Sequence, residues 1–238
     1  MKLGTIIAVV AAILLAVTTW YYYGSTSTAQ KERDDLKNMK EELLAKVNNL
    51  EQEKAAVTGR LEEQIASLSK EREKELDRLR STYDTLVTDL KGEIEQGQIT
   101  ITKMADWLSV SMVDKILFSS GEADLTEEGL KVLERVGKVL KNTENKVIRV
   151  EGHTDNVPIS PVLTKKFETN WELSTARATN VVRFLQDKAG IAPERLEAVG
   201  LSEFHPVSTN NTTAGKAQNR RIEIALLPNL REQASAPK

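Results

Sequence analysis

The stretch Lys146-Val147-Ile148-Arg149-Val150-Glu151-Gly152-His153-Thr154-Asp155-Asn156 decides the fold of this chain. Up to Glu151 it alternates apolar and charged side chains, which is the period of a half-buried β-strand. Gly152 ends the predicted strand, and four polar residues follow it on a loop. The pattern therefore places the carboxylate of Asp155 just beyond the end of a strand.

A second stretch, Asn170-Trp171-Glu172-Leu173-Ser174-Thr175-Ala176-Arg177, begins a predicted helix with Asn170 as its N-cap. The helix has an apolar stripe formed by Leu173, Ala176, Val181, Val182 and Leu185. Asp155 at the strand end and Arg177 one turn into the helix would face the same crevice. A carboxylate and a guanidinium group at a fixed separation can bind the two charges of a zwitterion, for example the free end of an amino acid. On spacing alone, an ordinary salt bridge or two separate surface charges is the favoured interpretation.

Three blocks carry a family resemblance: Gly152–Ile159, Asn170–Ala178 and Asn219–Ile224. Their order and spacing resemble the OmpA C-terminal domain family, in particular its branch in MotB-type proteins. The resemblance covers roughly Ile116 to Leu227. It implies non-covalent binding of peptidoglycan through the diaminopimelate of the stem peptide.

The resemblance also implies roles for single residues. Asp155 would take the ammonium of the ligand, and Arg177 would take its carboxylate. Asn170 would bond the ligand, serve as the N-cap, or do both. Thr154 would offer its backbone or hydroxyl, or only shape the loop, and Leu173 would pack beneath the site.

Two further positions follow from the resemblance. One of Arg220 and Arg221 would lie at the rim of the pocket; the alternative is that both are surface charges beside an edge strand. Alternation does not decide between the two arginines, and Arg221 is favoured. Phe118 and Ser119 match a loop in which many family members have Phe-Asp. Ser119 replaces that acid here, which removes one carboxylate and bears on stem-peptide preference.

The composition argues against several other classes of function. The chain has 238 residues, a net charge of −2 and no cysteine, so nothing indicates a nucleic-acid partner or a thiol nucleophile. His153 and His205 are far apart in sequence and are not spaced like zinc ligands. The sequence predicts no metal, no cofactor and no catalytic group, and therefore a binding protein and not an enzyme.

The N-terminus contains an uncharged apolar run, Leu3–Tyr23, as long as the roughly 20 residues that cross a bilayer. It ends in Trp20-Tyr21-Tyr22-Tyr23, which suits a membrane interface. We expect residues 1–28 to be an uncleaved anchor in the cytoplasmic membrane, with the rest in the periplasm. A signal peptide cleaved after Ser27-Thr28-Ala29 is the alternative, which would leave a free periplasmic or outer-membrane-associated protein.

Residues 29–97 are predicted to form a coiled-coil spacer. Apolar residues recur mostly at steps of three and four, with Lys54 and Arg72 on or near the seam. Such a helix would hold the following domain roughly 100 Å from the membrane. A parallel homodimer is favoured over a single charged helix or a hairpin.

Residues 98–228 are predicted to form an α/β two-layer sandwich, with a mixed sheet and both helices on one face. Residues 229–238 are polar and predicted to be disordered. The chain as a whole is therefore expected to tether a membrane to the cell wall. A subunit of a stator-like energy-transducing complex is the alternative, although the apolar run contains no acid to carry an ion.

Overall fold

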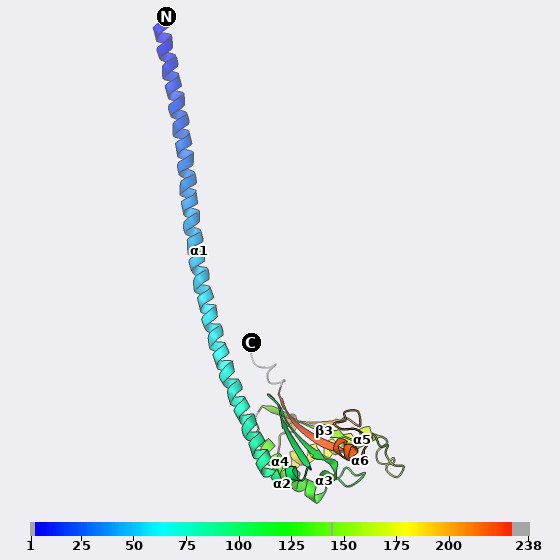
Figure 1. Ribbon diagram of the computed structural model, residues 1–238. Helices are drawn as coiled ribbons and strands as arrows, with labels where there is room; N and C mark the ends of the chain where they lie inside the picture. Colours follow the sequence, from blue (N-terminus) through cyan, green and yellow to red (C-terminus); the bar gives the residue numbers. More distant parts are fainter. Residues whose placement is uncertain (1–2, 144, 230–238) are drawn as a thin grey trace. The chain divides into compact units, whose positions relative to one another are not determined.

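The computed structural model describes residues 3–143 and 145–229. They divide into two compact units, Met1–Ser69 and Lys70–Lys238. Helix α1, Leu3–Asp89, is 87 residues long and contributes to both. Figure 1 shows the chain and labels its α-helices and strand β3. The predicted disordered tail, 229–238, lies outside the described residues except for Asn229.

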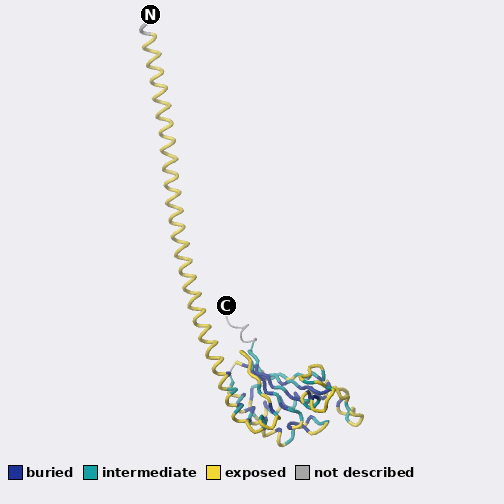
Figure 2. The backbone as a smooth tube through the Cα atoms, viewed as in Figure 1, coloured by how far each residue is buried: buried dark blue, intermediate teal, exposed yellow. Residues whose placement is uncertain are grey.

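The first unit consists of α1 alone. Every described side chain from Ile6 to Ser69 is exposed (Figure 2). By length and composition, α1 is the one helix among the described residues that could cross a membrane, and its apolar window near the N-terminus has a mean hydropathy of 1.9. A signal sequence would have the same properties, so the anchor and the cleaved signal both remain compatible with this helix.

The second unit is built on a five-stranded sheet with the order β1-β2-β5-β3-β4. Strands β3 and β4 are parallel, and the other neighbours are antiparallel. This mixed sheet confirms the predicted fold class. The strands are β1 Ile99–Lys103, β2 Leu108–Val113, β3 Lys146–His153, β4 Leu196–Gly200 and β5 Arg221–Pro228.

Helices pack on the apolar face of this sheet. Alternate residues of β3 and β5, such as Ile148 and Ile224, are fully buried in one core with Leu133 of α4 and Leu185 of α5. The opposite face carries polar side chains. The remaining elements are α2 Lys91–Glu95, α3 Asp114–Leu117, α4 Glu127–Lys141, α5 Asn170–Asp187, η1 Pro193–Arg195 and α6 Thr213–Asn219.

The two long helices of the domain begin at side-chain caps. Thr126 accepts a hydrogen bond from the backbone of Gly129 and caps α4. Helix α5 differs from the prediction, because its N-cap is Thr169 and Asn170 is the first helical residue. Thr169 and Glu172 form a capping box, which satisfies two backbone donors together. Asn170 is thereby released for contacts elsewhere.

Gly152 allows α5 to approach the end of β3 closely. A Cβ built at this position would lie 2.2 Å from the carbonyl oxygen of Ser174 on α5. Any larger residue would push the helix away from the strand. The glycine therefore fixes the distance between the loop after β3 and the first turns of α5.

The last turns of α1 belong to the core of the domain. Leu79, Leu86 and Leu90 are buried in the same cluster as the sheet residues. Lys146 of β3 lies 2.6 Å from Glu75 of α1. The compact unit thus begins at Lys70, whereas the sequence analysis placed the start of the domain at residue 98. The reason is that the apolar stripe of the predicted spacer continues into the domain and is buried there.

We expect Leu86→Ala to lower the free energy of unfolding of a Gln30–Lys238 fragment by about 2–5 kcal/mol, because it leaves a cavity in the core. Leu44→Ala is the matched control, since Leu44 lies on the same helix, is 52% exposed and stands outside the apolar stripe that includes Leu86. It should change that free energy by no more than about 0.5 kcal/mol. Denaturant unfolding followed by tryptophan fluorescence measures both. Equal stability of the two variants would place the end of α1 outside the core.

Candidate functional site

Arg177 is held on three sides near the start of α5. Its Nη1 lies 2.9 Å from Oδ1 of Asp114, which comes directly after β2. Its Nε donates to the carbonyl oxygen of Glu122 at 2.9 Å. The guanidinium also lies over the ring of Phe118, 4.9 Å from its centroid. The side chain is buried, so its orientation is fixed before any ligand arrives.

Asp155 lies in the loop after β3 and is also buried. Its carboxylate forms an ion pair with Arg220, which precedes β5. Its Oδ1 accepts a hydrogen bond from the backbone of Val157 at 3.1 Å. The buried carboxylate of Asp155 therefore has a fixed orientation, and its partner Arg220 is a partly exposed cation.

These two ion pairs act on each other. Burial raises the pKa of the Asp114 carboxyl above its ordinary value, although the positive charges of Arg177 and Arg220 oppose this and Asp155 adds to it. Burial likewise lowers the pKa of Arg177, against the attraction of Asp114 and Asp155. We call Asp114, Asp155, Arg177 and Arg220 the charge cluster. It brings together the acid and the base that the sequence singled out, but gives each a partner of its own.

Asn170 ties the charge cluster to the loops around it. Its Nδ2 donates to the carbonyl oxygens of Asp155 at 3.3 Å and Val157 at 3.1 Å, and to Oε2 of Glu203 at 2.7 Å. These contacts use the side chain that the sequence analysis assigned to an N-cap. Asn170 therefore joins the start of α5 to the loops that follow β3 and β4.

The other predicted site residues lie around the cluster. Thr154 is buried and donates its backbone N–H to Ser202 at 2.9 Å, while its hydroxyl forms no hydrogen bond within the described part of the chain. Leu173 is buried against Phe167. Ser119 is exposed, and its carbonyl accepts from the backbone of Glu122 at 3.0 Å.

Arg221, which the sequence analysis favoured over Arg220, lies away from Asp155. It shares the polar face of the sheet with Glu223, 3.4 Å from its guanidinium, and with Nε2 of His153, at 3.3 Å. The pKa of Glu151 lies below its ordinary value chiefly because of the side chain of His153, whose Nε2 lies 3.7 Å from Oε2 of Glu151. Ligand atoms of Glu151, His153 and Glu223 lie within 4.8 Å of one another, as in metal sites. Arg221 already supplies a positive charge to this group.

The sequence analysis missed Asp114, Glu203 and the role of Arg220. Asp114 carried a usable signal, because it follows the alternating strand Leu108–Val113 just as Asp155 follows β3. A carboxylate at each of two strand ends could have been recognised as a pair. Glu203 had no such signal, because it lies in an irregular loop.

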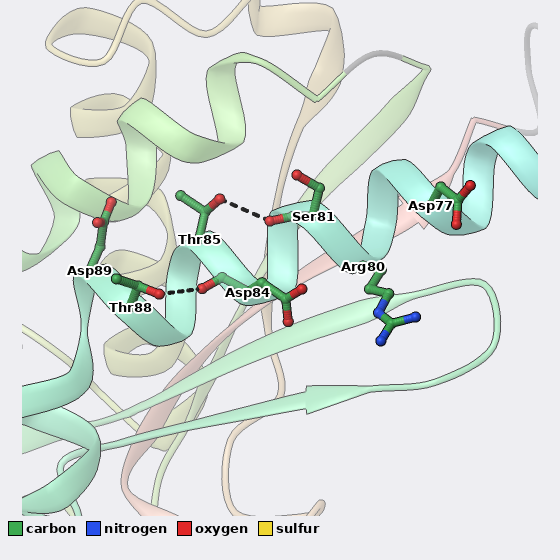
Figure 3. A pocket seen from close by; sticks show the side chains of 7 residues that line it. All are labelled: Asp77, Arg80, Ser81, Asp84, Thr85, Thr88 and Asp89. Atoms are coloured by element: carbon green, nitrogen blue, oxygen red, sulfur yellow. Dashed lines mark hydrogen bonds between the residues drawn. The ribbon is translucent and has the colours of Figure 1, made fainter.

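A hollow beside the last turns of α1 does not belong to this cluster (Figure 3). The hydroxyls of Thr85 and Thr88 donate to the carbonyl oxygens of Ser81 and Asp84 of the same helix, at 2.9 and 2.8 Å. These side chains are therefore engaged with their own backbone, and the hollow is interpreted as a solvated face of α1. It is lined by Asp77, Arg80, Ser81, Asp84, Thr85, Thr88 and Asp89.

Comparison with known proteins finds a family match over part of this chain. Residues 117–220 match the model of the OmpA family. Motility protein B of Bacillus subtilis is 30% identical over 156 residues, which are 66% of this chain and 58% of that protein. The chain spans about three fifths of the length of the curated relatives it matches.

Two solved structures share the fold. A protein described as MotB-like from Desulfovibrio vulgaris superposes with a TM-score of 0.59 at 29% identity, covering 66% of this chain and 98% of that one. The cell wall anchor of the T6SS from Pseudomonas aeruginosa does so with a TM-score of 0.55 at 32% identity, covering 60% and 96%. Both therefore correspond to the second unit of this chain more than to its N-terminal helix.

We expect Asp114→Ala to lower the free energy of unfolding by about 3–5 kcal/mol, because it leaves the buried guanidinium of Arg177 without its carboxylate. Asp124→Ala is the control. Asp124 is 84% exposed and lies 3.8 Å from Lys166, so its loss should cost less than about 1 kcal/mol. Thermal or denaturant unfolding measures the change in stability of both variants. A negligible effect of Asp114→Ala would show that the charge cluster does not hold the site together.

Proposed function

We propose that this chain, which belongs to the OmpA family through residues 117–220, binds peptidoglycan non-covalently and tethers a membrane to the cell wall. The observation that carries the proposal is the charge cluster, in which the buried carboxylate of Asp155, the half-buried carboxylate of Asp114 and two guanidinium groups form two ion pairs. The similarity to a cell wall anchor and to a motility protein supports the same role.

The ligand in this proposal is the free end of diaminopimelate in the stem peptide. Its ammonium would bind Asp155, and its carboxylate would bind Arg177. Without a ligand, Asp155 forms an ion pair with Arg220, and Arg177 forms one with Asp114. A zwitterion brings one charge of each sign to a cluster that is itself balanced, so it can exchange partners without leaving a buried charge unpaired.

The neighbouring residues would support this exchange. Asn170 and the backbone or hydroxyl of Thr154 would hydrogen-bond the ligand, while Leu173 and Phe118 would hold Arg177 and α5 in place. Arg220 is better placed than Arg221 to act at the rim, because it is partly exposed and contacts Asp155. Ser119, in place of an acid, would weaken the contact with the ligand's ammonium and alter stem-peptide preference.

The N-terminal helix would be the membrane anchor. Lys2 lies just before the apolar run and is positively charged, which favours a cytoplasmic position for that side and export of the rest. The domain would then act in the periplasm of the cell envelope as a binding module, without catalysis.

A stator-like subunit is the second candidate, and the similarity to Motility protein B favours it. Such a subunit needs an ionisable group inside the membrane to carry its ion. Leu3–Tyr23 contains none. A tether is therefore the better supported of the two functions.

We further infer that two chains pair in parallel through α1. Between Leu36 and Leu76 its apolar stripe is exposed, and at steps of three and four such a stripe needs a partner. From Leu79 onward the stripe is buried in the domain, so pairing would end before that residue. The exposed stripe consists of Leu36, Met39, Leu43, Val47, Leu50, Val57, Leu61, Ile65, Leu68 and Leu76.

Binding to purified sacculi tests the site. Asp155→Ala and Arg177→Ala should each weaken binding by an amount equivalent to about 2–5 kcal/mol, because each leaves an unmatched charge beside the ligand. Lys165→Ala, an exposed charge in the neighbouring loop, should bind as the parent does. Thermal unfolding of each variant checks that the domain is intact. Folded variants that bind as well as the parent would exclude this site.

Sedimentation tests the pairing. A fragment from Gln30 to Lys238 should sediment as a dimer at high micromolar concentration, because it retains the exposed stripe. A fragment from Lys70 to Lys238 keeps the compact domain and should be a monomer. If both fragments are monomers, the spacer does not self-associate in solution. Lys54 and Arg72 near the seam should make the dimer dissociate on dilution.

A further inference from the structure

Trp171 and Phe204 form an exposed aromatic pair at the edge of the charge cluster. Their rings are stacked with centroids 5.5 Å apart and an angle of 28° between their planes. Trp171 is 46% exposed and Phe204 is 62% exposed. Large aromatic rings are usually buried much more fully, so a pair that packs on itself and still faces water needs an explanation.

The pair is held in place from both sides. Trp171 is the second residue of α5, inside the capping box formed by Thr169 and Glu172. Phe204 lies in the loop after β4. Their neighbours in sequence, Asn170 and Glu203, are joined by a hydrogen bond of 2.7 Å. The two stacked rings are therefore held in a fixed arrangement before any ligand binds.

The same contacts connect the pair to the proposed ligand site. The Nδ2 of Asn170 that binds Glu203 also lies 3.3 Å from the carbonyl oxygen of Asp155. Consecutive Cα atoms are about 3.8 Å apart, so Trp171 lies within roughly 10 Å of Asp155 along this path. A ligand that reaches Asp155 can also reach the rings.

Peptidoglycan offers a group of matching shape at that distance. Two residues separate diaminopimelate from the amino sugar that carries the stem peptide, a span of roughly 10 Å when extended. A sugar ring has an apolar C–H face, which suits the negative face of an aromatic ring. Its hydroxyl and acetamido groups suit the polar side chains of Asn170 and Glu203 beside the rings.

We propose that Trp171 and Phe204 bind the sugar ring from which the bound stem peptide hangs. This inference rests on the proposed binding of peptidoglycan and adds a carbohydrate subsite to it. The pair is small and is bordered by an amide and a carboxylate, which favours a single sugar ring over the broad apolar surface of a protein partner.

The test compares two ligands on the full 238-residue chain in detergent micelles: a diaminopimelate-containing tripeptide, and the same tripeptide attached to its disaccharide. Calorimetry gives a Kd for each. The parent chain should bind the disaccharide-tripeptide about tenfold more tightly. Trp171→Ala and Phe204→Ala should bring the ratio of the two Kd values close to one, while Phe204→Tyr should preserve it. Met104→Ala, an exposed apolar residue in the β1–β2 turn, is the control and should also preserve it.

Three outcomes would overturn the inference. The parent chain could bind both ligands equally, which would leave no sugar subsite. The ratio could survive both alanine substitutions, which would leave the pair to a protein partner or to the stability of α5. The tripeptide could fail to bind the parent chain at all, in which case the proposed function itself fails and the subsite fails with it.

Discussion

The ion pair between Arg177 and Asp114 is the interaction on which the site depends. A buried guanidinium is tolerated only when a carboxylate and further acceptors surround it. Asp114 follows β2, Glu122 lies in the loop before α4, and Arg177 lies on α5. Satisfying this one charge therefore fixes three segments that are far apart in sequence. The second pair, Asp155 with Arg220, adds the ends of β3 and the start of β5 to the same point.

This arrangement explains why a binding site can be both rigid and ready to exchange partners. Each charge is held by protein groups before a ligand arrives, so little ordering is needed on binding. Arg220 is the partly exposed member of the cluster, so its ion pair with Asp155 can separate most easily, because water can solvate its guanidinium group. Asn170 links the cluster to the loop after β3 and to the loop after β4, which carries Phe204 of the aromatic pair.

The sequence predicted the strands of the sheet and the two main helices, because alternation and motif spacing report local structure directly, whereas Asp155 and Arg177 each form an ion pair with a residue that was not predicted as its partner. The cap of α5 was assigned one residue too late, although Thr169 and Glu172 have the spacing of a capping box. The choice between Arg220 and Arg221 could not be made, since it depends on the residue at which β5 begins. Glu203 required the tertiary structure, because it lies in an irregular loop and its partner Asn170 is remote in sequence.

The boundary of the domain was hidden for a different physical reason. One apolar stripe runs along α1, and its spacing is the same whether a second helix or the domain's own sheet covers it. Leu76 is 41% exposed and Leu79 is 5% exposed, so the partner of the stripe changes between these two residues. A second helix that extended its pairing past Leu79 would have to take leucines out of the core. The proposed self-association before this point and the folding of the domain after it would therefore use separate residues of one helix, so that either could be lost without the other.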